Sequence, residues 1–133
     1  MPALPDPFRI IAHRGASGFA PENTMAAFRA AVDMGATEVE TDVHYSRDRH
    51  LVLLHDHSVD RTTDGTGAPA YFTLEELKAL DAGAWFGAEQ AGERLITLDE
   101  LFEGFGEELT YHVELKEAAE GIGPVVAAVI ERF

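Results

Sequence analysis

Acidic residues recur at a spacing of two in one apolar stretch, as Glu40 and Asp42, and a later stretch carries Glu114 and Lys116 at the same spacing. Side chains two residues apart on a strand point to the same face. One such pair alone is usually part of a solvated face, but two neighbouring strands of this kind would gather three carboxylates and an ammonium group. That donor set, with positions left open for water, suits a hard cation such as Mg²⁺ or Ca²⁺.

Two histidines come at the ends of apolar stretches. His13 is followed by Arg14 and Gly15, at a position where α/β folds place residues that contact ligands, and His55 is followed by Asp56. A lone histidine at a strand end is more often structural. Two imidazoles beside a cation, however, can supply a general base and a general acid, because their unperturbed pKa is about 6.5.

The other histidines carry less weight. His44, His50 and His57 lie near expected turns, which predicts that they are exposed. His112 shares its strand face with Glu114, and one interpretation is that it supports the site from beneath.

Strands and helices must bring these residues together. Residues 8–13 and 37–45 predict two buried strands. Between them a glycine-bearing loop leads into a helix over residues 24–34, with Asn23 or Thr24 as its N-cap. The sequence therefore predicts a strand, loop and helix unit that returns to a second strand.

The stretch over residues 51–55 follows the second strand after too few residues for a parallel crossover, so we expect an antiparallel hairpin. A two-residue turn within residues 47–49, in either of its two registers, would place His55 opposite Glu40 or Asp42. A slip of one residue would move His55 to the other face.

Residues 58–97 predict an excursion from this pattern, and capping boxes at residues 73–76 and 97–100 mark two helix starts. Trp85 and Phe86 are expected to pack the excursion onto the main body, and the simplest interpretation makes them core side chains without a further role. A third strand over residues 109–115 then leads into a last helix that begins near Pro124.

Strands that alternate with helices predict an α/β fold with a parallel sheet, in a single domain over residues 1–133. Three such units and one excursion do not close a barrel. We therefore expect an open sheet with exposed apolar side chains on its helices, namely Phe28, Val32, Val126 and Ile130.

The composition excludes several functions. The chain has 24 acidic and 10 basic residues and a formal net charge of −14, so its field repels nucleic acid. It has no cysteine, which excludes disulfides, thiolate nucleophiles and cysteine-bound zinc. No stretch approaches the roughly 20 apolar residues of a transmembrane segment, and the first residues lack the pattern of a signal peptide, so we expect a cytoplasmic protein.

Six short motifs together resemble, in order and spacing, the signature of bacterial glycerophosphodiester phosphodiesterases. They are His13-Arg14-Gly15, Pro21-Glu22-Asn23-Thr24, Glu40-Thr41-Asp42-Val43, His55-Asp56, Arg61-Thr62-Thr63 and Glu114-Leu115-Lys116. The resemblance covers residues 10–116 and corresponds to the N-terminal half of that family.

The resemblance implies an enzyme that hydrolyses glycerophosphodiesters, small molecules of lipid and glycerol metabolism, to glycerol 3-phosphate and an alcohol. The implied metal ligands are Glu40, Asp42 and Glu114. His13 and His55 would be the acid/base pair, and Arg14 and Lys116 would hold the phosphate. The neighbouring glycerol hydroxyl would attack phosphorus, and water would then open the cyclic phosphate.

The fold implied by the resemblance is a TIM-type (β/α)8 barrel, which needs about 250 residues. This chain would supply about three βα units with the hairpin and the inserted excursion, and its partners would be a second copy or the missing C-terminal half. Two other interpretations are a non-catalytic half-barrel that binds cation and phosphate or serves in assembly, and a different lipid phosphodiesterase.

Overall fold

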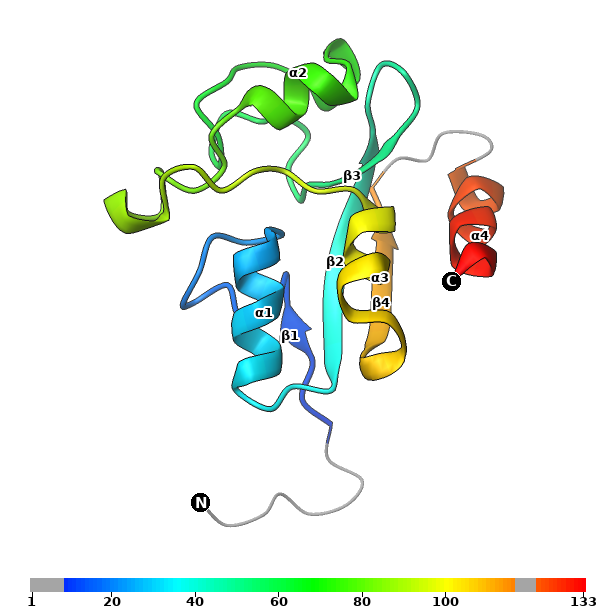
Figure 1. Ribbon diagram of the computed structural model, residues 1–133. Helices are drawn as coiled ribbons and strands as arrows, with labels where there is room; N and C mark the ends of the chain where they lie inside the picture. The colour runs from blue at the N-terminus through cyan, green and yellow to red at the C-terminus, as the bar shows by residue number, and fades with distance from the viewer. Residues whose placement is uncertain (1–8, 117–121) are drawn as a thin grey trace.

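The computed structural model describes residues 9–116 and 122–133, which form a four-stranded sheet with helices packed on it (Figure 1). The central strand β2 (Glu38–Tyr45) pairs in parallel with β1 (Ala12–His13) and with β4 (Thr110–Leu115). The short strand β3 (Leu51–Leu53) pairs with the end of β2 in antiparallel orientation. The predicted α/β fold with a mainly parallel sheet is confirmed.

Strand β1 is shorter than predicted. Only Ala12 and His13 pair with β2, and residues 9–11 run beside the sheet without forming strand. The start of the predicted strand, Phe8, lies outside the described residues. Because β4 occupies one edge of β2 from Glu38 to Val43, β1 and β3 share the other edge at different heights.

The helix α1 (Met25–Asp33) connects β1 with β2, and local signals set its ends. Thr24 is the N-cap, because its hydroxyl accepts a hydrogen bond from the backbone N–H of Ala27 at 3.4 Å. At the other end, the N–H groups of Gly35 and Ala36 turn back to helix carbonyls, with Gly35 at a φ of 91°. The predicted helix is confirmed to within one residue at each end.

Three helices cover one face of the sheet: α1, α3 (Leu98–Phe105) and α4 (Ile122–Arg132) (Figure 1). Val39 and Val43 of β2 are fully buried beneath them in the main core. Since alternate residues of a strand point to opposite faces, Glu40 and Asp42 lie on the face that these helices leave free.

This packing corrects the expected exposure of the helices. Phe28 and Val126 are buried in the main core and Val32 packs against it, whereas Ile130 is 52% exposed as predicted. The open sheet therefore still has one well-covered face. Within the described residues, no helix is long and apolar enough to cross a membrane.

The hairpin between β2 and β3 has a loop of three residues rather than two. Tyr45 pairs with Leu51, and the N–H of Ser46 donates to the carbonyl of His50 at 2.9 Å, which leaves residues 47–49 as the loop. The last of these takes the left-handed conformation that such loops require.

The register of the hairpin changes the expected place of His55. Pairing of Val43 with Leu53, continued by two residues, would set His55 opposite Thr41 rather than opposite Glu40 or Asp42. Moreover, β3 ends at Leu53, so His55 lies beyond the paired residues. The predicted cross-strand pairing of His55 is therefore wrong.

The excursion contains α2 (Leu74–Ala79), and both predicted capping boxes are present, at Thr73 for α2 and at Thr97 for α3. Short 3₁₀ turns occur at Pro69–Tyr71, Ala88–Gln90 and Gly106–Glu108. A second, smaller core joins the excursion to β3 and to residues that flank it, namely Val52, Leu54, Val59, Leu77, Ala82 and Leu95.

Trp85 and Phe86 do not pack the excursion onto the main body. Trp85 is 39% exposed, its ring meets Phe86 edge-on, and its indole N–H donates to the carbonyl of Ala82 at 3.0 Å. The predicted role of the two aromatic residues is wrong, because the apolar side chains of the smaller core hold the excursion instead.

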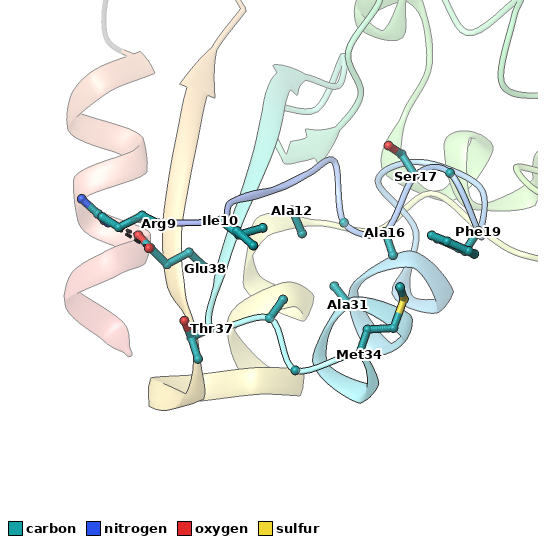
Figure 2. A pocket seen from close by; sticks show the side chains of 14 residues that line it. Arg9, Ile10, Ala12, Ala16, Ser17, Phe19, Ala31, Met34, Thr37 and Glu38 are labelled. Carbon is teal, nitrogen blue, oxygen red and sulfur yellow. Dashed lines mark hydrogen bonds and ion pairs between the residues drawn. The ribbon is translucent and has the colours of Figure 1, made fainter. Parts of the chain in front are cut away.

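A groove of about 560 Å³ runs beside β1, between residues 9–19 and the end of α1 (Figure 2). Ile10, Phe19 and Met34 line it, and each is more than 60% exposed. The groove includes none of the predicted metal ligands and neither predicted acid/base histidine.

Candidate metal centre and acid/base site

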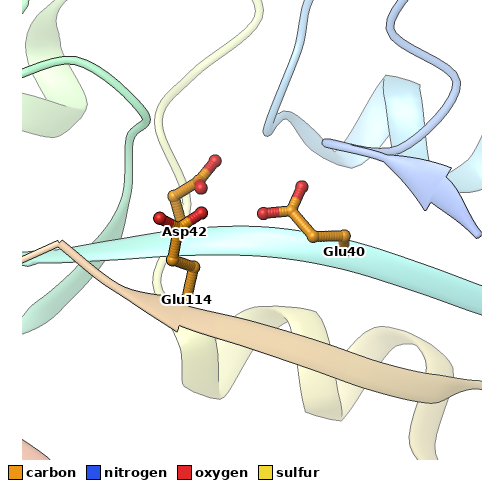
Figure 3. Close-up of side chains that lie close together, drawn as sticks. All are labelled: Glu40, Asp42 and Glu114. Carbon is orange, nitrogen blue, oxygen red and sulfur yellow. The ribbon is translucent and has the colours of Figure 1, made fainter.

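The two strands β2 and β4 bring three carboxylates together on the free face of the sheet. Glu40 and Asp42 point from β2, and Glu114 stands opposite Asp42 on β4 (Figure 3). One oxygen from each lies within 4.8 Å of the others. Parallel pairing in this register makes the three residues neighbours, as their strand positions predict.

The surroundings of these carboxylates favour a bound cation. Asp42 is completely buried, and burial together with the neighbouring Asp42 carboxylate raises the pKa of Glu40 to about 7. One buried oxygen of Glu40 (Oε1) and one of Asp42 (Oδ1) have no hydrogen-bond partner. Buried carboxylate oxygens that lack donors are costly unless a cation satisfies them, so this donor set fits a hard metal ion.

Two cationic side chains flank the carboxylates. The Nε of Arg14 lies 3.8 Å from Oδ2 of Asp42, and the Nζ of Lys116 lies 3.7 Å from Oδ1 of the same residue. Lys116 also donates to Oε1 of Glu114 at 3.0 Å. The structure therefore brings both predicted phosphate-binding residues to the carboxylates, each near a different oxygen of Asp42.

Arg14 is held by its backbone as well as by its side chain. Its φ of 60° is unusual for a residue other than glycine. Its N–H donates to the carbonyl of Glu40 at 2.9 Å and lies 3.2 Å from the Oε2 of the same residue. Strained backbone of this kind is common where a side chain is held for function.

Asn23 positions Asp42 and was not among the residues predicted to act at the site. Its side-chain N–H donates to Oδ2 of Asp42 at 3.1 Å, and its carbonyl oxygen accepts from the hydroxyl of Thr41 at 2.8 Å. Asn23 is buried, with a φ of 56°. The sequence signal that could have indicated this role is an asparagine directly before the N-cap of α1, because asparagine tolerates the left-handed backbone conformation.

His13 lies beside the carboxylates of the candidate metal centre, and its imidazole is open to solvent. Its Nε2 is 3.7 Å from Oε2 of Glu40, and its side chain is 64% exposed. The pairing of His13 with Glu40 across β1 and β2 explains this position. A substrate that bound at the carboxylates would therefore meet this histidine from the solvent side.

His55 is connected to the same site only indirectly. Its Nδ1 is hydrogen-bonded to Oδ1 of Asp56 at 2.8 Å, and its side chain is about one-third exposed. Arg61 joins Asp56 to Glu22, and Glu22 accepts from Nη1 of Arg14 at 3.2 Å. Asp56, Arg61 and Glu22 thus connect His55 to Arg14, and none of the three was assigned a role from the sequence.

The remaining histidines divide into three cases. His50 and His57 are exposed, as predicted. His44 is buried, which corrects the prediction: it shares the face of Asp42, and its Nε2 lies 3.5 Å from the carbonyl of His55. His112 is hydrogen-bonded to Glu38, which lies two residues before Glu40 on β2. Arg9 forms an ion pair with the same Glu38.

Comparison with a known family gives a match over most of the chain. The model of the glycerophosphoryl diester phosphodiesterase family matches residues 13–130. That range includes each residue predicted to carry the chemistry, namely His13, Arg14, Glu40, Asp42, His55, Glu114 and Lys116.

Curated relatives carry the corresponding name. The chain is 52% identical over 108 residues to the glycerophosphodiester phosphodiesterase of Caldanaerobacter subterraneus, which is 80% of this chain and 44% of the relative. It is 38% identical over 120 residues to the glycerophosphodiester phosphodiesterase of Bacillus subtilis, which is 84% of this chain and 41% of that one. The chain thus spans less than half the length of these relatives.

Solved structures agree. The glycerophosphodiester phosphodiesterase of Agrobacterium tumefaciens is similar with a TM-score of 0.88 and 39% identity, over 93% of this chain and 52% of that one. A phosphodiesterase of Oleispira antarctica, solved in complex with the product sn-glycerol-3-phosphate, is similar with a TM-score of 0.86 and 40% identity over the same shares.

Proposed function

This chain belongs to the glycerophosphoryl diester phosphodiesterase family, and we propose that it carries the metal-binding and acid/base residues of an enzyme that hydrolyses glycerophosphodiesters to glycerol 3-phosphate and an alcohol. The observation that carries the proposal is the convergence of Glu40, Asp42 and Glu114, two of which have a buried oxygen without a hydrogen-bond donor. The match in family and the named relatives support the substrate class.

In this proposal the three carboxylates hold one divalent cation, Ca²⁺ or Mg²⁺. Both ions bind carboxylate oxygens at metal–oxygen distances of about 2.0–2.6 Å. The three oxygens lie within 4.8 Å of one another, so small movements of the side chains would let all three reach one such ion. A cation bound there would polarise a phosphoryl oxygen and offset the negative charge of the reacting group.

The protein residues would then share the remaining work. Arg14 and Lys116 would bind phosphate oxygens beside the cation, because each already lies next to Asp42. One of His13 and His55 would take the proton from the glycerol hydroxyl that attacks phosphorus, and the other would give a proton to the leaving alkoxide. Water would open the resulting cyclic phosphate to glycerol 3-phosphate.

We further propose that the described elements are the first βα units of a (β/α)8 barrel, with the excursion inserted after the second strand. The parallel pairing of β1, β2 and β4 and the helices on one face support this proposal, as do similar structures of which the chain covers about half. The remaining strands would close the pocket around the alcohol group. The expected cytoplasmic location stays a prediction.

Cation binding is the first test. We expect calorimetric titration with Ca²⁺ or Mg²⁺ to show one site, and Asp42→Asn to weaken binding by more than about 10-fold, since even residues behind metal ligands contribute 10- to 100-fold. Glu38→Gln is the matched control, because Glu38 points from the same strand face but pairs with Arg9 and His112. Equal cation affinity in the two variants would show that Asp42 is not a metal ligand.

Hydrolysis is the second test. With glycerophosphocholine and Ca²⁺, the release of glycerol 3-phosphate should disappear with a chelator. His13→Ala or His55→Ala should lower turnover by about 10²- to 10⁴-fold while cation affinity stays the same. Cation binding without any hydrolysis would instead favour the non-catalytic half-barrel, an alternative that the partial coverage of the relatives keeps open.

A further inference from the structure

Arg61 bridges two carboxylates that lead to different parts of the candidate site. Its Nε and Nη2 donate to Asp56 at 2.9 and 3.0 Å, and its Nη2 and Nη1 donate to Glu22 at 2.7 and 3.1 Å. We propose that Arg61 is a positioning residue, which fixes the proton-bearing nitrogen of His55 through Asp56 and holds Arg14 through Glu22. This inference rests on the proposed function.

The first arm of the bridge sets the tautomer of His55. Asp56 accepts from Nδ1 of His55 at 2.8 Å, and an ionised carboxylate can only accept, so the hydrogen must lie on Nδ1. The two hydrogen bonds from Arg61 hold the pKa of Asp56 well below its usual range, which keeps this carboxylate ionised at neutral pH. Nε2 of His55 is then the nitrogen that exchanges a proton with substrate.

The second arm holds the guanidinium of Arg14. Oε1 of Glu22 accepts from Nη2 of Arg61 at 2.7 Å and from Nη1 of Arg14 at 3.2 Å. The Glu22 side chain is only 10% exposed, so it shares its charge between two arginines away from bulk water. Without Arg61, Glu22 would be free to turn toward Arg14 alone and to compete with phosphate for it.

A direct role of Arg61 in substrate binding fits the geometry less well. An arginine has five N–H donors, and hydrogen bonds to Asp56 and Glu22 engage all three of its nitrogens. One face of its guanidinium also lies 5.7 Å from the ring centre of Trp85. Arg61 is therefore already committed to protein partners, and its influence on substrate would pass through His55 and Arg14.

The tautomer of His55 tests the proposal without any need for catalysis. In protein labelled with ¹⁵N-histidine, at a pH where the rings are neutral and with Ca²⁺ present, we expect the imidazole nitrogen signals of His55 to report hydrogen on Nδ1. Arg61→Gln should shift this population toward hydrogen on Nε2, the form that a free imidazole prefers. His55→Gln assigns the signal.

If Arg61→Gln does not fold, Arg61→Lys provides a second test, because lysine preserves the positive charge but cannot form the paired hydrogen bonds. Arg47→Lys is the matched control: Arg47 also links the excursion to the hairpin, through Glu76 and the carbonyl of Tyr71, away from the carboxylates. An unchanged His55 tautomer in both Arg61 variants would overturn the proposal, as would an equal shift in Arg47→Lys.

Kinetics separate this role from the proposed function. In protein that hydrolyses glycerophosphocholine, Arg61→Lys should lower kcat by about 10- to 100-fold, the usual effect of a residue that orients an active-site group. It should also raise KM, because Glu22 would compete with phosphate for Arg14, and should leave Ca²⁺ affinity unchanged. A tautomer shift in a chain without activity would leave this inference standing and count against the proposed function. Full activity in Arg61→Lys would overturn the inference.

Discussion

Asp42 is the residue on which the contacts of the candidate site converge. It has no exposed surface, and it lies within reach of Asn23, Arg14 and Lys116 at once. A buried carboxylate is stable only when its oxygens are paired, and removal of one partner leaves an uncompensated charge. The orientation of Asp42 therefore depends on the neutral amide of Asn23 as well as on the two cations.

Asn23→Gly should weaken Ca²⁺ binding by about 10- to 100-fold, because Asp42 would lose the amide that orients it. Glycine suits the φ of 56° at this position, so the loss would come from the hydrogen bond rather than from backbone strain. Thr41→Val, which removes only the hydroxyl that orients the Asn23 amide, should have a smaller effect. Calorimetry would measure both, and unchanged affinity in Asn23→Gly would contradict this role.

Glu40 should make the stability of the cation-free chain depend on pH. Its pKa is raised from 4.5 to about 7 in the folded chain, so between these values the folded state binds more protons than the unfolded state. Stability should therefore fall as pH rises from about 4.5 to 7 and then level off. Melting temperatures in a chelator at several pH values would measure the slope.

Glu40→Gln should reduce this slope, since glutamine does not titrate. Other groups also contribute, so the difference between the two curves is the quantity of interest. Ca²⁺ should restore more stability at pH 8 than at pH 5, because protons compete with the cation for Glu40. Curves of equal slope in the native chain and the variant would show that the Glu40 carboxyl is not perturbed.

The turn from β1 into α1 depends on the close approach of two backbones. Gly15 has a φ of 78°, and a Cβ at this position would lie 2.7 Å from the carbonyl carbon of Ala27. The N–H of Ala16 donates to the carbonyl of Ala27 at 2.9 Å, which holds the two segments together. His13 and Arg14 immediately precede this contact, so their positions rest on it.

Gly15→Ala should destabilise the fold by about 1–2 kcal/mol from the left-handed φ alone, and by more because of the clash with α1. Gly18→Ala is the control in the same loop, because a Cβ there would meet no atom within 4 Å. Urea unfolding of both variants would measure the difference. Equal stabilities would mean that α1 can shift away from the loop at little cost.

Elements with strong local signals were predictable from the sequence. Thr24, Thr73 and Thr97 cap their helices as expected, because a capping hydrogen bond needs only residues within the next turn. The antiparallel hairpin of β2 and β3 was predicted correctly, but its register was not, because a left-handed Arg49, stabilised over the Tyr45 ring at 4.4 Å, adds one residue to the loop. One residue suffices to reverse which side chains share a face.

The candidate site was also predictable only in part, where it depends on local spacing. Strand parity was enough to group Glu40, Asp42 and Glu114, since it depends only on spacing and on parallel pairing. The surroundings of His55 and the burial of His44 depend on contacts between segments far apart in the chain. The role of Asn23 was not predicted for a similar reason, because Asp42, which its amide contacts, lies 19 residues away in the sequence.

At the scale of the whole molecule, the sheet has two open sides. Among the described strands, β1 and β4 each pair with β2 alone. The groove beside β1 adds the exposed side chains of Ile10, Phe19 and Met34. Unpaired strand edges next to apolar surface favour association with other chains.

We expect the purified chain to self-associate, and a C-terminal half of the barrel to compete with this association. The net charge of −14 opposes contact between copies, so added salt should strengthen it by screening. Ile10→Lys should weaken association, whereas Tyr71→Lys, at an exposed residue outside the groove, should not. Sedimentation would measure both, and a monomer at all salt concentrations would contradict the expectation.

The contact of Trp85 with Arg61 gives the molecule an optical reporter of its own. Trp85 is the single tryptophan of the chain, so ultraviolet fluorescence comes from one known place in the excursion. Its emission is sensitive to a charged neighbour, and Arg61 connects that neighbourhood through Glu22 and Arg14 to the carboxylates. A change of emission on addition of Ca²⁺ would therefore show, without any label, that the excursion responds to cation binding at the candidate metal centre.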